Sequence, residues 1–221
     1  MNPNYSVATH ASSSTLATNK LIRNTYTLLS MTLLFSAGTA AVGVMMNLSQ
    51  GMGLGATIAA IVMLWFVLPR TANSAAGIPV IFAITGLLGL GLGPVLNYYL
   101  AVNPSIVMTA LGGTGAIFLG LSAYALTTRK DFSFMAGFLM VGMFVVIGAA
   151  LLNIFLSIPV LSLAVSAAVI MLMSGFILFQ TSSMVNGGET NYIMATASLF
   201  LSIVNMFQAL LHILGAFNNN D

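Results

Sequence analysis

Long apolar runs separated by short polar breaks dominate the chain. A helix needs about 20 apolar residues to cross the hydrocarbon layer of a bilayer, and seven runs approach or exceed that length. The predicted transmembrane spans are residues 25–46, 53–69, 77–100, 105–127, 133–155, 158–181 and 191–215. The pattern therefore predicts an all-α membrane protein, a bundle of seven transmembrane helices. The hairpin at Ser157-Ile158-Pro159 is so short that spans five and six must be antiparallel neighbours.

Both ends of the chain are polar. Residues 1–24 are rich in Asn, Ser and Thr and lack the apolar core of a secretory signal. They are expected to form a retained, poorly ordered cytoplasmic tail, while the first span also serves as the insertion signal. Residues 216–221 form a short polar C-terminal tail, which leaves one transmembrane domain over 25–215.

The basic residues predict the orientation, because Lys and Arg near span ends stay on the cytoplasmic side. Lys20 and Arg23 precede span one, Arg70 follows span two, and Arg129 and Lys130 follow span four. If the chain crosses the membrane seven times, all five basic residues lie on the same side. The N-terminus is therefore predicted to be cytoplasmic and the C-terminus external.

Composition excludes several classes of function. Apolar residues make up 59% of the chain and charged residues only 4%, whereas soluble domains carry roughly 25% charged residues. Arg129-Lys130 is the single adjacent basic pair, too little for a nucleic-acid surface. The chain has no cysteine, which excludes disulfides and thiolate chemistry. No cofactor or metal is expected, and the lipid bilayer is the expected surrounding partner.

The seventh span carries a polar stripe. Ser198, Ser202, Asn205 and His212, with Ala209 between the last two, are spaced so that they lie along one side of a helix. Polar groups in hydrocarbon need partners, so this stripe is expected to face the bundle interior and make span seven the central helix. The stripe could line a water path or hold helices together, and the sequence leaves both open.

Glycines cluster in the third span before a proline. Gly86, Gly89 and Gly93 precede Pro94, and Gly89 and Gly93 have GxxxG spacing, which allows close approach of helix backbones. Pro94 removes one helix hydrogen bond and is expected to kink the span. The cluster is interpreted as a close-packing surface or, alternatively, as a hinge or pore wall.

One enzyme hypothesis arises from Ser122 and His212. Gly120-Leu121-Ser122-Ala123 together with a histidine is compatible with an intramembrane serine protease, in which a His base activates Ser. Such a tetrapeptide is expected by chance in a span rich in small residues. The chain is therefore predicted not to be an enzyme, and His212 has no companion at metal-ligand spacing.

Several blocks resemble the Bax inhibitor-1 family, also called the transmembrane Bax-inhibitor-motif family. The family signature is matched by Gly86-Leu87-Leu88, Gly93-Pro94-Val95-Leu96, Ala110 and Thr114 through Ile117-Phe118. The bacterial, YccA-like branch is matched by Leu21 to Tyr26, Tyr124 to Phe134 (YALTTRKDFSF) and Gly187 to Ile193. The resemblance implies a seven-span bundle in which the other helices surround the polar seventh helix.

The resemblance also implies two alternative functions. Members of the YccA-like branch modulate the membrane-embedded ATP-dependent protease FtsH, which would grip the polar tail. Other members are calcium leaks that use two aspartates and a basic residue as a proton-sensitive latch. Here Gln180 and Ser202 stand at the two aspartate positions and Arg70 lies near the basic one. Because neither Gln nor Ser titrates, the leak is the second choice.

Overall fold

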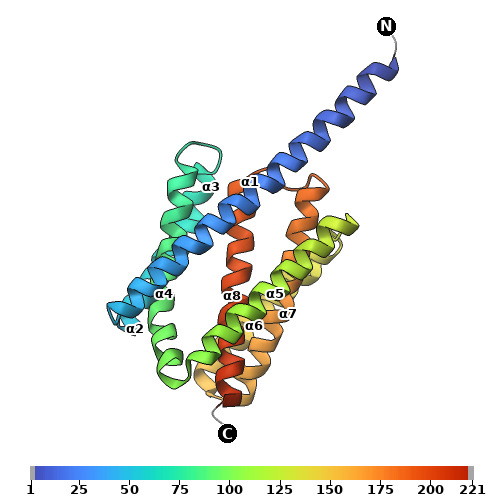
Figure 1. Cartoon of the computed structure of the whole chain (residues 1–221). Helices are drawn as coiled ribbons and strands as arrows, with labels where there is room; N and C mark the ends of the chain where they lie inside the picture. Colours follow the sequence, from blue (N-terminus) through green and yellow to red (C-terminus); the bar gives the residue numbers. More distant parts are fainter. Residues whose placement is uncertain (1–2, 219–221) are drawn as a thin grey trace.

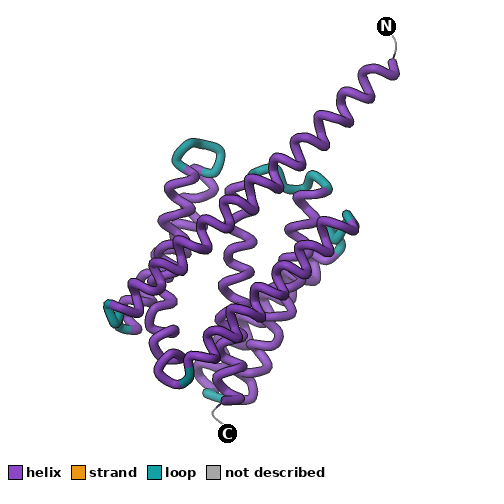
Figure 2. The backbone as a smooth tube through the Cα atoms, in the orientation of Figure 1, coloured by secondary structure: helices purple, strands orange, loops and turns teal. Residues whose placement is uncertain are grey.

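The computed structural model describes residues 3–218, with side chains from residue 16 onward, and Figure 2 shows helices joined by short loops. The elements are α1 (Pro3–Met45), α2 (Gln50–Val62), the π-helix η1 (Met63–Val67), α3 (Leu68–Thr71), α4 (Gly77–Val102), α5 (Pro104–Thr128), α6 (Met135–Leu156), α7 (Pro159–Val185) and α8 (Tyr192–Asn218). Seven helical stretches are long and apolar enough to cross a membrane, with α2, η1 and α3 forming one of them over Gln50–Thr71. The predicted seven-helix architecture is confirmed.

The first helix differs from the expectation at its start. α1 begins at Pro3 and is continuous to Met45, so the polar segment expected to be poorly ordered is helical in its described part. The stretch Leu16–Met45 of α1 is long and apolar enough to cross a membrane and contains nearly all of the predicted span 25–46. Extending an existing helix requires no new nucleation, which accounts for the continuation into polar sequence. Figure 1 shows this N-terminal part of α1 projecting away from the bundle.

The second span is interrupted by a π-helix. α2 is followed by η1, whose wider turn precedes Pro69 in α3. Proline lacks a backbone N–H and disturbs the helix before it, and π-turns accommodate such disturbances. Arg70 Nη1 donates a hydrogen bond of 2.6 Å to the Phe66 carbonyl oxygen across this segment. The span therefore reaches full length, from Gln50 to Thr71, despite the break.

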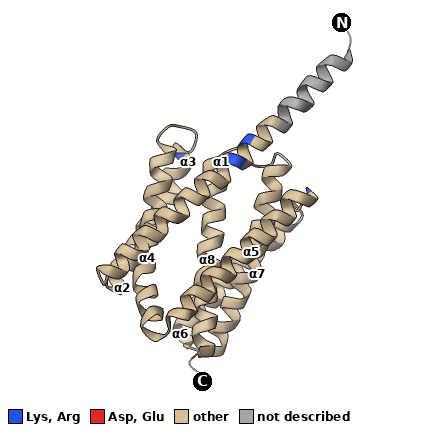
Figure 3. Ribbon diagram, in the orientation of Figure 1, with Lys and Arg blue, Asp and Glu red and all other residues tan. Residues whose placement is uncertain are grey.

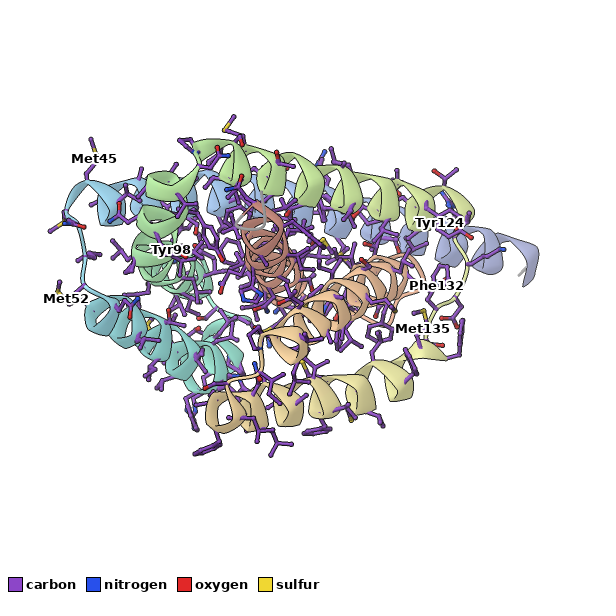
Figure 4. The ribbon with its side chains drawn as sticks, turned by 90° about the horizontal axis from the view of Figure 1, so that it is seen from below. Met45, Met52, Tyr98, Tyr124, Phe132 and Met135 are labelled. Atoms are coloured by element: carbon purple, nitrogen blue, oxygen red, sulfur yellow. The ribbon has the colours of Figure 1, made fainter. Side chains whose placement is uncertain are left out.

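Helix α8 lies at the centre of the bundle. It packs against α1, α4, α5 and α7, and the most buried stretch among the seven spans belongs to it. Figure 4, which views the molecule from below, shows α8 within a ring of the other helices. By contrast, α6 packs chiefly on α7 and leaves most of its surface free for lipid. The predicted central seventh helix is therefore confirmed.

The glycines of α4 lie where α4 meets its neighbours. A Cβ atom added at Gly89 would overlap Thr39 and the backbone of Ser36, and one at Gly93 would lie 2.9 Å from the Cα of Gly43. A Cβ atom added at Gly86 would lie 2.7 Å from the Phe35 ring. All four of these partner residues belong to α1. Glycine is thus required for the close contact between α1 and α4.

Pro94 does not end its helix. α4 continues through it to Val102. The proline ring lies against α2, because a Cβ atom added at Gly53 would be 2.8 Å from Pro94 Cγ. The glycine and proline cluster therefore joins α4 to both α1 and α2.

The basic residues gather at one end of the bundle (Figure 3). The loops at this end are joined by side-chain hydrogen bonds. Ser182 Oγ donates to the Lys130 carbonyl oxygen at 2.9 Å and accepts from the Phe132 N–H at 3.0 Å. Asn191 Nδ2 donates to the Ala72 carbonyl oxygen at 3.0 Å. These bonds connect the loop before α6 to the end of α7, and the loop before α8 to the loop before α4.

Candidate functional site along α8

His212 joins α8 to α7 through two serines. Its Nδ1 lies 3.0 Å from Ser166 Oγ and its Nε2 lies 3.2 Å from Ser162 Oγ. Ser162 and Ser166 are one helical turn apart on α7, so both face the same side. Ser166 Oγ also donates to the Ser162 carbonyl oxygen at 3.1 Å. Both ring nitrogens of His212 are therefore satisfied within the protein, as expected of a residue that holds two helices together.

The polar stripe does not face the packed interior along its whole length. Ser202 is buried, 4% exposed, and its Oγ donates to the Ser198 carbonyl oxygen at 3.0 Å. Asn205, at the midpoint of α8, is exposed instead, which corrects the expectation for this residue. The reason is that the apolar side of α8, with Leu199, Phe200 and Leu211 fully buried, fills the contacts with the surrounding helices. Asn205 is therefore left outside the packed contacts of α8.

Gln208 extends the stripe and was not identified from the sequence. It lies one turn beyond Asn205 and is also exposed. Gln208 lines a cavity of about 390 Å³ together with Gln50 and Thr57 of α2 and Tyr98 and Tyr99 of α4. The spacing of Asn205, Gln208 and His212, three and then four residues apart, could have identified Gln208 as part of the stripe from the sequence.

A second, smaller cavity lies beside the first. Its volume is about 250 Å³, and His212, Tyr98 and Tyr99 are among its lining residues. The two cavities share both tyrosines, and Figure 4 labels Tyr98 on α4. The half of α8 beyond Asn205 therefore borders two adjoining cavities with mixed polar and apolar linings, at the end of the molecule opposite the basic residues.

In the part of the chain that the structure describes, the three latch-equivalent residues, Gln180, Ser202 and Arg70, share no hydrogen-bond partner. Gln180 has a buried Oε1 atom without a hydrogen-bond partner among the described residues. The hydroxyl of Ser202 bonds within α8, and the guanidinium of Arg70 bonds the Phe66 carbonyl oxygen. The neighbouring Thr181 Oγ1 lies 3.3 Å from the hydroxyl of Tyr26 on α1. Among the described residues, no hydrogen bond links Gln180, Ser202 and Arg70 into a latch.

Ser122 and His212 do not form a catalytic pair. Phe207 and Leu211 of α8 pack against Ile106 and Ala110 of α5, which places His212 at the level of the first turns of α5. Ser122 lies about 18 Å farther along α5, given 1.5 Å per residue. A nucleophile and its base need direct hydrogen-bond contact. The serine protease hypothesis is therefore excluded for this pair.

The chemistry that α8 can offer is hydrogen bonding by neutral groups. Within the described spans from Leu16 onward there is no carboxylate, because Asp131 and Glu189 both lie in loops. Serine, asparagine, glutamine and histidine can bind polar partners, but they provide no fixed negative charge for a cation. The site is suited to contacts with water, polar solutes or polar side chains.

Comparison with known proteins identifies the family. The family described as "Inhibitor of apoptosis-promoting Bax1" matches residues 18–219. A Vibrio cholerae protein named "Uncharacterized membrane protein" is 51% identical over 209 residues, or 94% of each chain. "Modulator of FtsH protease YccA" of Escherichia coli K12 is 49% identical over 209 residues, 94% of this chain and 95% of the relative. The chain therefore belongs to the Bax inhibitor-1 family of membrane proteins, in its YccA-like branch.

Proposed function

We propose that this protein is a non-enzymatic inner-membrane modulator of the membrane-embedded ATP-dependent protease FtsH. The observation that carries the proposal is the 49% identity, over 94% of the chain, to a protein named as a modulator of that protease. A second relative with the same identity is named "Inner membrane protein YccA", from Escherichia coli O6:H1. Similarity over nearly the whole length of both proteins favours a shared role.

The projecting part of α1 supports a specific mode of action. ATP-driven unfoldases need a chain end to engage. The part of α1 before Leu16 projects away from the bundle, where a protease could reach it (Figure 1). The protease would engage this end and then meet the closely packed α1–α4 pair. Slow extraction of that pair would make the protein a poor substrate that occupies the enzyme.

The mode of action requires the N-terminus to be cytoplasmic. The basic residues at one end of the bundle support this orientation, with the C-terminus external. Reporter tags placed after Asn73, after Lys130 and at the C-terminus test it. The first two tags are expected on the cytoplasmic side and the third outside. Placement of the Asn73 and Lys130 tags on opposite sides would contradict the topology.

The direct test is degradation by the protease in reconstituted membranes. The full-length protein is expected to copurify with FtsH and to be degraded slowly, at a rate that depends on the first 15 residues. A variant with those residues replaced by a shuffled polar sequence of equal length is the control for length alone. If a variant lacking residues 1–15 is degraded at the full-length rate, the tail has no such role. If neither protein binds the protease, the proposal as a whole is wrong.

The exposed polar residues of α8 favour a second candidate function, an ion leak. Gln208 lines the larger of the two cavities beside Tyr98 and Tyr99, and Asn205 is exposed one turn earlier on α8. Liposomes containing the protein would then show ion flux that falls when Asn205 is replaced by Leu. Flux no greater than that of empty liposomes between pH 6 and 8 would exclude the leak. The absence of a carboxylate from the spans described from Leu16 onward makes this the weaker candidate.

A further inference from the structure

A large apolar cavity lies on the side of α8 away from the polar stripe. Its volume is about 620 Å³, and α1, α4, α5 and α8 contribute its walls. Ser36 and Thr114 are the polar members of its lining, and Thr114 Oγ1 is satisfied by a 2.7 Å hydrogen bond to the Ala110 carbonyl oxygen. The other lining residues are apolar and uncharged. The space between α1 and α5 that contains this cavity is called here the α1–α5 groove.

The groove is open toward the lipid and closed toward the centre of the bundle. Along its rim, Met45 of α1 is 84% exposed and Leu111 of α5 is 52% exposed. Its floor is formed by Ile203, Val204 and Phe207 of α8, all buried. In Figure 1, α8 is seen in the gap between α1 and α5. Hydrocarbon therefore has lateral access to the central helix.

The length of the groove corresponds to one leaflet of a bilayer. It runs along α1 from Leu33 to Met45, about 18 Å at 1.5 Å per residue. Along α5 it runs from Val107 to Phe118, about 17 Å by the same measure. Half of the hydrocarbon thickness is about 15 Å. Because a tilted helix covers less depth than its own length, the groove length of about 17–18 Å matches the depth of one leaflet. A transmembrane helix would need a surface about twice as long.

An aromatic contact closes the groove at its inner end. The rings of Phe118 and Tyr26 lie 6.0 Å apart and connect α5 to α1. Beyond this contact, toward the basic end of the molecule, the hydroxyl of Tyr26 lies 3.3 Å from Thr181 Oγ1 of α7. The groove thus ends near the middle of the membrane and opens at the end opposite the basic residues.

We infer that the α1–α5 groove is a binding site for one acyl chain of a membrane phospholipid, from the leaflet opposite the basic residues. Hydrocarbon that fills this open hollow restores the van der Waals contacts that an unfilled wall forfeits, whereas water would find few hydrogen-bond partners there, with Ser36 and Thr114 as the polar lining residues. The apolar lining, the single-leaflet length and the aromatic end match a lipid chain better than a helix. This site is independent of the protease role, since it concerns the lipid side of the molecule.

Two glycine positions on α5 provide a matched test. Gly115 lines the groove and Gly120 does not, and a Cβ atom added at either meets no atom within 4 Å. Gly115→Leu should therefore fold as well as Gly120→Leu but fill the groove. The same contrast exists on α1 between Ala37→Leu in the groove and Gly38→Leu outside it.

The experiment is native mass spectrometry of full-length protein transferred into mild detergent from phosphatidylethanolamine–phosphatidylglycerol vesicles. The unaltered protein, Gly120→Leu and Gly38→Leu should retain one phospholipid. Gly115→Leu and Ala37→Leu should retain it about tenfold less, as follows if leucine displaces about two methylene groups of the chain. Gel filtration and the thermal aggregation midpoint establish that each variant is folded.

Three results would overturn the inference. Equal lipid retention in all variants would place any bound lipid elsewhere. No retained lipid in the unaltered protein would leave the groove without a lipid site. A change in the number of protein copies per particle, confined to Gly115→Leu and Ala37→Leu, would make the groove an interface between two copies of the chain.

Discussion

The Oγ atom of Ser166 lies 3.0 Å from Nδ1 of His212, a contact that joins α7 to the central helix near the end opposite the basic residues. Together with Ser162, it satisfies both imidazole nitrogens of a half-buried side chain. In an apolar environment, a hydrogen bond lost from one partner leaves the other unsatisfied. The two serines should therefore contribute to stability rather than to catalysis.

The first prediction concerns these two serines. The double variant Ser162→Ala/Ser166→Ala should lose about 1–3 kcal/mol, because His212 would be left without partners. At about 2–4 °C per kcal/mol, a clear fall of the thermal aggregation midpoint in mild detergent is expected. Ser174→Ala is the control, since the Ser174 hydroxyl bonds only to the Ile170 carbonyl of its own helix. An equal fall in both variants would contradict a special role for the His212 contacts.

The second prediction concerns Asn191, which caps α8 and ties it to the loop before α4. Its Oδ1 accepts the Ile193 N–H at 2.9 Å, and its Nδ2 donates to the Ala72 carbonyl oxygen at 3.0 Å. Asn191→Ala should cost about 2 kcal/mol, combining a lost cap with a lost loop contact. Asn191→Asp keeps the cap acceptor and removes the donor, so its midpoint should lie between those of Asn191→Ala and the unaltered protein. A midpoint for Asn191→Asp equal to that of Asn191→Ala would show that the cap contributes nothing.

The sequence predicted the helices better than the contacts between them. Seven spans follow from hydropathy alone, and the spacing of the polar stripe correctly placed the last helix at the centre. The exposure of Asn205 could not be predicted, because it depends on which neighbours surround α8 on its other sides. The partners of His212 could not be predicted either, because Ser162 and Ser166 meet it only through the register of α7 against α8. The local pattern of apolar and polar residues determines where helices form. The contacts between helices depend on how each helix is shifted and rotated against its neighbours.

The third prediction concerns the α1–α4 contact. Gly89→Ala should destabilise the protein by about 1–3 kcal/mol, the usual cost of overpacking, because the added methyl group would overlap Thr39 and the Ser36 backbone. Gly38→Ala on α1 adds the same methyl group into open space and should leave stability unchanged or slightly raised. Thermal midpoints of the two variants give the comparison. An unchanged midpoint for Gly89→Ala would mean that α1 and α4 are less closely packed than described.

The fourth prediction concerns Asn205, whose amide is exposed at the middle of the central helix and has no hydrogen bond to the described residues. An amide facing hydrocarbon without a partner is unfavourable by about 1–3 kcal/mol on protein-based scales. If lipid covers this face, Asn205→Leu should raise the thermal midpoint. Leu201→Ile, a half-buried position one turn earlier, is the control for a change of shape without a change of polarity. A lower midpoint for Asn205→Leu would instead mean that water or a polar partner meets this amide, and would favour the ion-leak candidate once flux was measured in the same variant.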